Sequence, residues 1–268
     1  MPNQIQESSS YDIIQDELQR FEPIGLEQMK GVKLMNRIDT KYVIPIAQLA
    51  PLLRIAAPDY YVQCTDGKRT ASYHTIYLDT PDHRMYNLHQ SGRKVRQKIR
   101  IREYEDTHNT FLEVKNKNNH GRTKKKRIEV PGCTVEANTC LQTLPQESSA
   151  FIAEKSWFKL SDLKPHVENR FERITLVNRA FTERLTIDLG VSFHNDENTR
   201  DADIAHLVII ELKRDGATFS PMYNLLVRLH IHPGGFSKYC IGCALTNPQL
   251  RRNNLKEKLH RIERLKEQ

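Results

Sequence analysis

The sequence predicts an α+β protein: a closed antiparallel β-barrel with helices packed on the outside. Two features of the 268-residue chain indicate this class. Several segments alternate between apolar residues and residues that include Lys or Arg, which is the period-two pattern of strands with one apolar face. Segments with helical spacing lie between and after these strands and can cover the apolar faces. A closed barrel would then collect the charged faces in its interior.

The clearest alternation lies in residues 94–103, which read KVRQKIRIRE. A helix would scatter the cations of this segment around its axis, whereas a strand places alternate residues on opposite faces. The basic face consists of Lys94, Arg96, Lys98, Arg100 and Arg102. The other face is largely apolar and consists of Val95, Gln97, Ile99 and Ile101. We therefore expect a strand that turns a row of cations to one side.

The other elements follow in chain order. Strands are expected over residues 36–44, 72–80, 110–117, 123–130, 171–181, 183–190 and 206–216. Helices are expected over 11–30, after Thr80-Pro81, over 145–159, after Ser220-Pro221 and beyond the glycines at 234 and 235, with proline favoured at the first helical position. The expected organisation is an N-terminal helical segment (1–30), a barrel domain (31–245) and a C-terminal amphipathic helix (246–268) that packs on its own domain or, alternatively, on a partner.

Composition limits the function classes. The formal net charge of +8 and a pI of about 9.2 favour an anionic partner. Five cysteines with a single CxxC pattern argue against a disulfide framework and a cysteine zinc site. Residues 1–30 lack a signal-peptide pattern, and the longest apolar stretch, near 204–212, is too short for a transmembrane helix, so we expect a cytoplasmic protein.

A barrel interior lined by cations requires anions. Two like charges 4 Å apart repel by roughly 4 kcal/mol at an effective dielectric constant of 20, so an empty interior would be strained. The planar guanidinium of Arg binds two phosphate oxygens at once, and Lys supplies a mobile charge. Nucleic acid is not expected, because the aromatic residues are not interleaved with the basic runs.

Several segments between about residues 33 and 243 read, in chain order, RIDTKYVI, YLDTPD, KIRIRE, FLEVKNK, KKKR, NRAF with ERLTIDLG, VIIELK and FSKY. Together and in this order they resemble the VTC domain, the polyphosphate polymerase branch of the triphosphate tunnel metalloenzymes. The resemblance implies an antiparallel triphosphate tunnel that transfers the terminal phosphate of ATP to a growing polyphosphate chain, with Mn²⁺ or Mg²⁺.

The resemblance also implies roles for particular residues. Lys41, Arg100, Arg102 and Lys115 would hold the triphosphate from one wall, and Lys125, Arg179 and Arg184 from others. Ser237 and Lys238 would close over it, and Glu211 would be the metal carboxylate. Lys117 stands where eukaryotic relatives have histidine. The catalytic set is then Lys41, Arg100, Arg102, Lys115, Arg179 and Lys238.

Strand alternation adds Lys98, Arg127 and Lys213 to the expected substrate-binding residues, which also include Lys117, Lys125, Arg184 and Ser237. In residues 124–127 it turns Lys125 and Arg127 inward and Lys124 and Lys126 outward. Asp188 is either a second metal carboxylate or a structural ion-pair partner. Glu211 could likewise pair only with Lys213 or another cation.

Three function classes stay open: a polyphosphate polymerase, a triphosphatase that hydrolyses ATP or tripolyphosphate, and a non-catalytic polyphosphate binder. The retained Glu211 favours catalysis, and the missing ExExK signature of the triphosphatase branch favours the polymerase. Expected partners are ATP and polyphosphate or triphosphate. Whether a membrane protein couples synthesis to transport is left open.

Overall fold

The computed structural model describes residues 2–32, 34, 37–216 and 218–266. Its strands are β1 (Glu22–Ile24), β2 (Arg37–Pro45), β3 (Tyr60–Gln63), β4 (Ala71–Asp79), β5 (Arg96–Tyr104), β6 (Asn109–Lys117), β7 (Thr123–Glu129), β8 (Lys164–Asn178), β9 (Glu183–Asn195), β10 (Arg200–Asp203) and β11 (Leu207–Asp215). Its helices are α1 (Pro2–Leu18), α2 (Leu26–Met29), α3 (Leu49–Ala56), α4 (Arg84–Gln90), α5 (Glu147–Lys155), α6 (Pro221–Arg228), α7 (Lys238–Thr246) and α8 (Lys256–Lys266).

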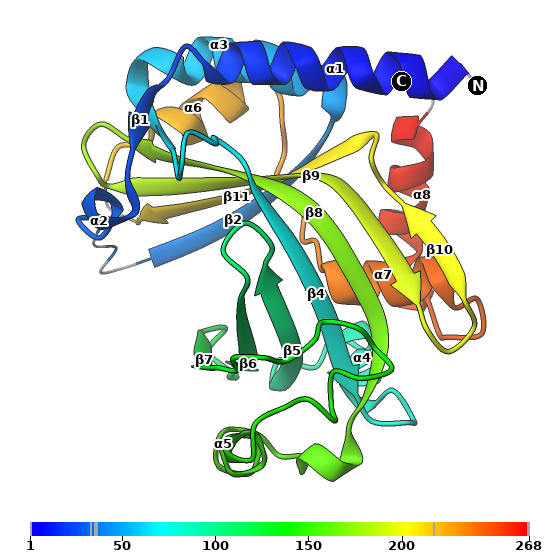
Figure 1. Ribbon diagram of the computed structural model, residues 1–268. Helices are drawn as coiled ribbons and strands as arrows, with labels where there is room; N and C mark the ends of the chain where they lie inside the picture. Colours follow the sequence, from blue (N-terminus) through cyan, green and yellow to red (C-terminus); the bar gives the residue numbers. More distant parts are fainter. Residues whose placement is uncertain (1, 33, 35–36, 217, 267–268) are drawn as a thin grey trace.

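The strands form one strongly curved sheet in the order β2-β11-β9-β8-β4-β5-β6-β7, and neighbours along this path are antiparallel. Within the described residues β2 and β7 do not pair with each other, so the sheet is an open half-barrel (Figure 1). The expectation of an antiparallel sheet with outer helices is confirmed, but the expectation of a closed barrel is wrong.

Hydrogen bonds to the outer edge of β2 explain why the barrel stays open. The amide of Gly234, in the segment that leads into α7, donates to the carbonyl of Lys41 at 2.8 Å. The Arg261 guanidinium, from α8, donates to the carbonyl of Val43 at 3.2 Å. A loop and a helix therefore use edge groups that strand pairing would need, and an edge satisfied in this way does not recruit another strand.

Two hydrophobic cores pack the helices on the sheet. One packs α1, α3 and α6 on the half formed by β2, β11, β9 and β8, and includes Ile14, Leu52, Ile187 and Ile210. The other packs α5 and the connection before it on the outer face of β4, β5 and β6, and continues on the concave side, where α7 packs on β8 and β9. Among the described residues, none of the helices is long and apolar enough to cross a membrane.

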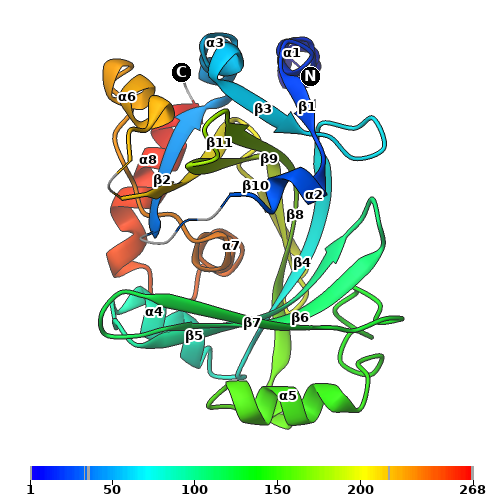
Figure 2. The same cartoon turned by 90° about the vertical axis from the view of Figure 1, so that its left-hand side faces the viewer.

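Helix α7 lies within the concavity of the sheet, where Figure 2 shows it end-on between the two arms. Ser237 is its N-cap, and its hydroxyl accepts from the amide of Cys240 at 3.2 Å. Gly242 allows the helix to approach Phe193 of β9 closely, since an added Cβ would lie 2.5 Å from that ring. The close packing fixes the N-terminus of α7 against the concave face.

Candidate functional site: a cationic concave face

The concave face of the half-barrel is built by strand register. Arg100 lies opposite Glu113 and Tyr77, Lys98 opposite Lys115, and Lys115 opposite Lys125, so side chains two residues apart along each strand share this face. On the other arm Glu211 lies opposite Lys41, and Lys213 opposite Arg184. The cations gathered on this face are Lys41, Arg96, Lys98, Arg100, Arg102, Lys115, Lys117, Lys125, Arg127, Arg173, Arg184, Lys213 and Lys238.

The carboxylates Glu113, Asp188 and Glu211 interrupt these cations. Glu113 is fully buried and accepts from Arg100 at 2.6 Å and from Lys125 at 2.7 Å. Asp188, which is 4 % exposed, accepts from Arg173 at 2.6 and 2.9 Å and from Lys238. Each carboxylate thus holds more than one cation in place.

Glu211 completes the set of carboxylates. It accepts from Lys41 and, at 2.8 Å, from Lys213. Burial alone would raise the pKa of Glu211, but the Lys213 and Lys41 ammonium groups hold it far below the usual range. Arg173 and Lys238 have the same effect on the pKa of Asp188, and Arg100, Arg102 and Lys125 on the pKa of Glu113. These carboxylates are therefore ionised at neutral pH.

The remaining cations are too numerous for these carboxylates to neutralise. Burial lowers the pKa of Lys98 to about 8, and burial lowers the pKa of Lys238 to about 7 despite its contact with Asp188. Arg100, together with burial, lowers the pKa of Lys115 well below its ordinary value. Burial and Arg100 lower the pKa of Arg102 to about 10. An anion bound on this face would relieve the crowding and raise these pKa values.

Aromatic rings form part of the floor between the two arms. Tyr73 and Phe171 stack with centroids 5.0 Å apart. The guanidinium carbons of Arg102 and Arg173 lie 5.3 and 4.9 Å from the Tyr73 centroid, and the Lys238 ammonium lies 3.9 Å from the Phe171 centroid. These cation–π contacts orient the cations without using their hydrogen-bond donors, while Arg173 and Lys238 also donate to Asp188.

Most of the site residues expected from the sequence share this face. Lys117, Lys125 and Arg127 lie toward the rim, where Lys125 and Arg127 are exposed. Ser237 faces Lys98, whose ammonium donates to its hydroxyl at 2.8 Å.

Arg179 is the predicted residue that the structure does not bring to the site. It follows the last residue of β8 and pairs with Glu22 at 3.0 Å, while its Nε donates to the carbonyl of Pro58 at 2.6 Å. Its guanidinium also stacks over Tyr61, 4.8 Å from the ring centroid.

Arg96, Glu113 and Arg173 belong to the face although they were not among the predicted site residues. The signal for each was present as alternation: Arg96 precedes Lys98 by two residues, and Glu113 precedes Lys115 by two. Arg173 lies opposite Asp188 in the sheet, and that cross-strand pairing is not readable from a single strand.

The expected metal carboxylates, Glu211 and Asp188, stand on the neighbouring strands β11 and β9 and share the concave face. Among the described residues they do not belong to a cluster of three protein ligand groups. Magnesium-type ions are commonly held by one or two carboxylates plus substrate phosphates and water. The donor set therefore fits a divalent ion that arrives with phosphate, because phosphate oxygens can take over the ammonium groups that now occupy the carboxylates.

The fold and this face define a half-barrel protein with a cationic concavity. The VTC domain family matches the chain over residues 36–247, which is most of its length, so the chain belongs to the VTC domain family and the resemblance seen in its motifs is confirmed. No curated protein matches the chain.

Several solved structures are similar in fold. A candidate adenylyl cyclase from Hippeastrum, described as having a dominant triphosphatase activity, is 15% identical with a TM-score of 0.49, covering 78% of this chain and 96% of that one. A candidate adenylate cyclase from Bacillus halodurans is 16% identical with a TM-score of 0.45, covering 76% and 96%. One from Vibrio parahaemolyticus is 11% identical with a TM-score of 0.43, covering 78% and 99%.

Proposed function

We propose that this VTC domain protein is a metal-dependent polyphosphate polymerase that transfers the terminal phosphate of ATP to a growing polyphosphate chain bound on the concave face. The observation that carries the proposal is the set of cations on β2, β11, β9, β8, β5, β6 and β7, which outnumber the carboxylates among them. Phosphoryl transfer depends mainly on positioning and charge neutralisation, and this face supplies both.

The extent of the cationic face supports a polymeric ligand. Along β5 alone, the row from Arg96 to Arg102 spans roughly 20 Å at about 3.3 Å per residue. Beyond β5, the cationic face extends across the sheet to the exposed Lys125 and Arg127 of β7 at the rim. A chain of many phosphates could contact the buried centre and the rim together, whereas a single triphosphate would leave much of the face uncompensated.

The residues divide the work by position. Arg100, Arg102 and Lys115 surround Glu113 in the centre and would bind the reacting phosphates, and Lys41 would bind them from β2. Lys238, at the start of α7, would close over them.

Further side chains support this centre. Lys98, Lys213, Arg184 and Ser237 would hold adjoining phosphates, and Glu211 with Asp188 would hold Mn²⁺ or Mg²⁺. A bound divalent ion would supply charge neutralisation on the phosphate oxygens. We do not assign Arg179 a role at the site, because its guanidinium is held by Glu22 and Pro58.

One assay tests the proposal. The protein is incubated with ATP and Mn²⁺, and the products are separated by gel electrophoresis and assayed for free phosphate. We expect long phosphate chains that a polyphosphatase degrades, and we expect the Glu211→Gln variant to lose this activity while still binding tripolyphosphate without metal. Free phosphate without chains would show a triphosphatase, and no turnover with retained binding would show a non-catalytic binder; both outcomes would overturn the polymerase.

A further inference from the structure

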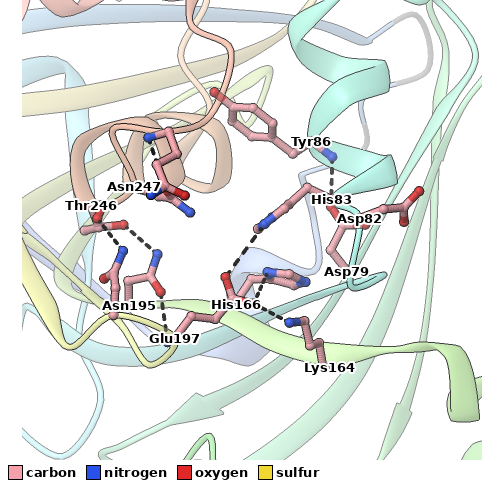
Figure 3. Close-up of polar contacts among 12 residues, drawn as sticks. Asp79, Asp82, His83, Tyr86, Lys164, His166, Asn195, Glu197, Thr246 and Asn247 are labelled. Atoms are coloured by element: carbon pink, nitrogen blue, oxygen red, sulfur yellow. Dashed lines mark hydrogen bonds and ion pairs between the residues drawn. The ribbon is translucent and has the colours of Figure 1, made fainter.

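A second cluster of ionisable groups lies apart from the concave cations, at the end of the sheet where β8 begins (Figure 3). It consists of His83 at the N-cap of α4, His166 on β8 and Glu197 in the turn between β9 and β10. One ligand atom from each of the three lies within 4.8 Å of the others. The cluster therefore joins three segments that are distant in the sequence.

The hydrogen bond of His166 determines which of its nitrogens is free. Its Nε2 lies 2.9 Å from the carbonyl of Thr80, which can only accept, so Nε2 carries the proton. Nδ1 then presents a lone pair toward Glu197, 3.6 Å from Oε1. The His166 side chain is 1% exposed, and among the described residues its Nδ1 has no hydrogen-bond partner. A buried hydrogen-bond acceptor without a partner lowers the stability of the folded protein. The lone pair of Nδ1 points toward Glu197, which is the direction in which a cation would be bound.

His83 approaches the same carboxylate from the other side. Its Nε2 lies 3.7 Å from Oε2 of Glu197, and the two imidazole centroids are 4.3 Å apart. The backbone of His83 is left-handed, with φ of 56° and ψ of 42°, which is uncommon for a residue other than glycine. This conformation places the imidazole above His166 at the start of α4.

The spacing suits a tetrahedral ion. With zinc–ligand bonds of about 2.0–2.1 Å, ligand atoms at a tetrahedral centre lie roughly 3.3 Å apart. The separations of 3.6 Å from His166 to Oε1 of Glu197 and 3.7 Å from His83 to Oε2 are each within a few tenths of an ångström of that value, and they reach the two different oxygens of one carboxylate. The contacts are also too long for direct hydrogen bonds, and a bound ion would bridge the histidines and the carboxylate.

The protonation states suit a metal as well. Burial lowers the pKa of His166, and the neighbouring His83 lowers it further, which keeps the imidazole neutral. Lys164 and His166 hold the pKa of Glu197 below its usual range although burial opposes them, which keeps the carboxylate ionised. Lys164 also pairs with Oε1 of Glu197, but its side chain is 40% exposed and can turn to solvent.

We propose that His83, His166 and Glu197 bind a transition-metal ion of the zinc type, with water in the fourth position, at a site separate from the concave phosphate face. Two imidazoles with one carboxylate favour zinc and similar ions over magnesium and manganese. The Thr80 carbonyl orients His166, as hydrogen-bonded partners commonly do for metal-binding histidines. The ion would fasten α4 and the β9–β10 turn to β8.

The proposal is independent of the polymerase activity, and binding measurements test it. Protein without a histidine tag is titrated with Zn²⁺ in competition with a chromogenic chelator. We expect one tight equivalent, and we expect His83→Ala and Glu197→Gln each to weaken it by about tenfold or more. His108→Ala, at a histidine side chain that is 84% exposed, is the matched control and should bind zinc as the unchanged protein does.

A second readout locates the ion and guards against variants that fold poorly. Co²⁺ in place of Zn²⁺ should give the intense visible absorption of a four-coordinate site, and this absorption should be lost in Glu197→Gln, which keeps the shape of the side chain. Glu211→Gln should retain it. Absence of a tight equivalent, zinc affinity in both ligand variants equal to that of the unchanged protein, or loss of the cobalt spectrum only in Glu211→Gln would overturn the proposal.

Discussion

At the scale of single residues, β5 separates stability from ligand binding. Ile99 and Ile101 are fully buried in the outer core, whereas Arg100 and Arg102 turn toward the concave face and are 8% and 6% exposed. Arg102 donates to the hydroxyl of Thr75 at 3.1 Å, and Arg100 is held by Glu113. Adjacent positions on one strand therefore have opposite roles.

The first prediction compares neighbours on this strand. Ile101→Ala should reduce the free energy of unfolding by about 2–5 kcal/mol, because it leaves a cavity in a fully buried site. Arg102→Ala should cost less stability, because it removes one cation from a crowded set, but should weaken tripolyphosphate binding. Chemical denaturation and calorimetric titration measure the two effects. The reverse result would mean that the strand register is off by one residue.

The second prediction concerns Lys98, whose pKa burial lowers to about 8. Above that pH the free protein loses this charge, so tripolyphosphate affinity should fall as the pH rises from about 7 to about 9. Because a bound anion favours the ammonium form, binding near pH 8 should take up protons. Calorimetry in buffers of different ionisation enthalpy measures the uptake. Lys98→Arg keeps the charge but does not titrate, so an undiminished uptake in that variant would contradict the assignment.

Alternation along single strands predicted which side chains share the concave face, because the side-chain period of a strand is two. It could not place Arg179, since that residue lies beyond the end of β8, where alternation no longer applies. Nor could it reveal that Arg173 pairs with Asp188, which depends on how β8 and β9 align.

At the scale of elements, helix α7 connects the fold to the site. Its N-cap Ser237 contacts Lys98, its first residue Lys238 contacts Asp188, and Tyr239 donates to Asp79 at the end of β4. The sequence predicted a glycine-hinged segment that passes into a helix. It did not show that this helix lies inside the sheet's curve, because that position depends on long-range packing against Phe193.

The third prediction tests this packing. Gly242→Ala would place a Cβ 2.5 Å from the Phe193 ring, so we expect a loss of about 1–3 kcal/mol in the free energy of unfolding from overpacking. The shift of α7 should also weaken tripolyphosphate binding through Lys238. Gly235→Ala is the control, because an added Cβ there first meets the flexible Lys258 side chain at 3.5 Å. Equal effects of the two substitutions on unfolding and binding would contradict the role of the α7 packing.

At the scale of the whole molecule, the sheet is a half-barrel, and the carboxylates on its concave face neutralise only part of the positive charge there. The sequence predicted the antiparallel sheet and its outer helices but not the open edge. Alternation defines the faces of each strand and carries no information about closure. The open edge depends on Gly234 and Arg261, which bond to β2 from segments far along the chain.

The fourth prediction follows from the uncompensated charge. Tripolyphosphate should raise the melting temperature at low ionic strength, because it relieves repulsion among the concave cations. At a free concentration one hundred times its dissociation constant, binding should stabilise the folded state by about 2.7 kcal/mol. Differential scanning fluorimetry with and without added salt measures the shift, which should shrink as salt screens the charges. A melting temperature unaffected by saturating tripolyphosphate would contradict a phosphate-binding concavity.

The most direct measurement of the central claim uses the edge strand β7, whose lysines and arginine alternate between faces. Lys125 and Arg127 lie on the concave side, opposite Lys115 and Glu113, and Lys124 and Lys126 lie on the other. Two double variants, Lys125→Ala with Arg127→Ala and Lys124→Ala with Lys126→Ala, remove the same charge. Long-chain polyphosphate binding is measured for both by calorimetry at low ionic strength.

The concave pair should weaken polyphosphate binding by about tenfold or more, since hydrogen bonds to charged groups contribute about 1.5–3 kcal/mol each, while the outer pair should leave it nearly unchanged. Equal weakening by the two pairs, or a larger effect of the outer pair, would show that polyphosphate does not bind on the concave face.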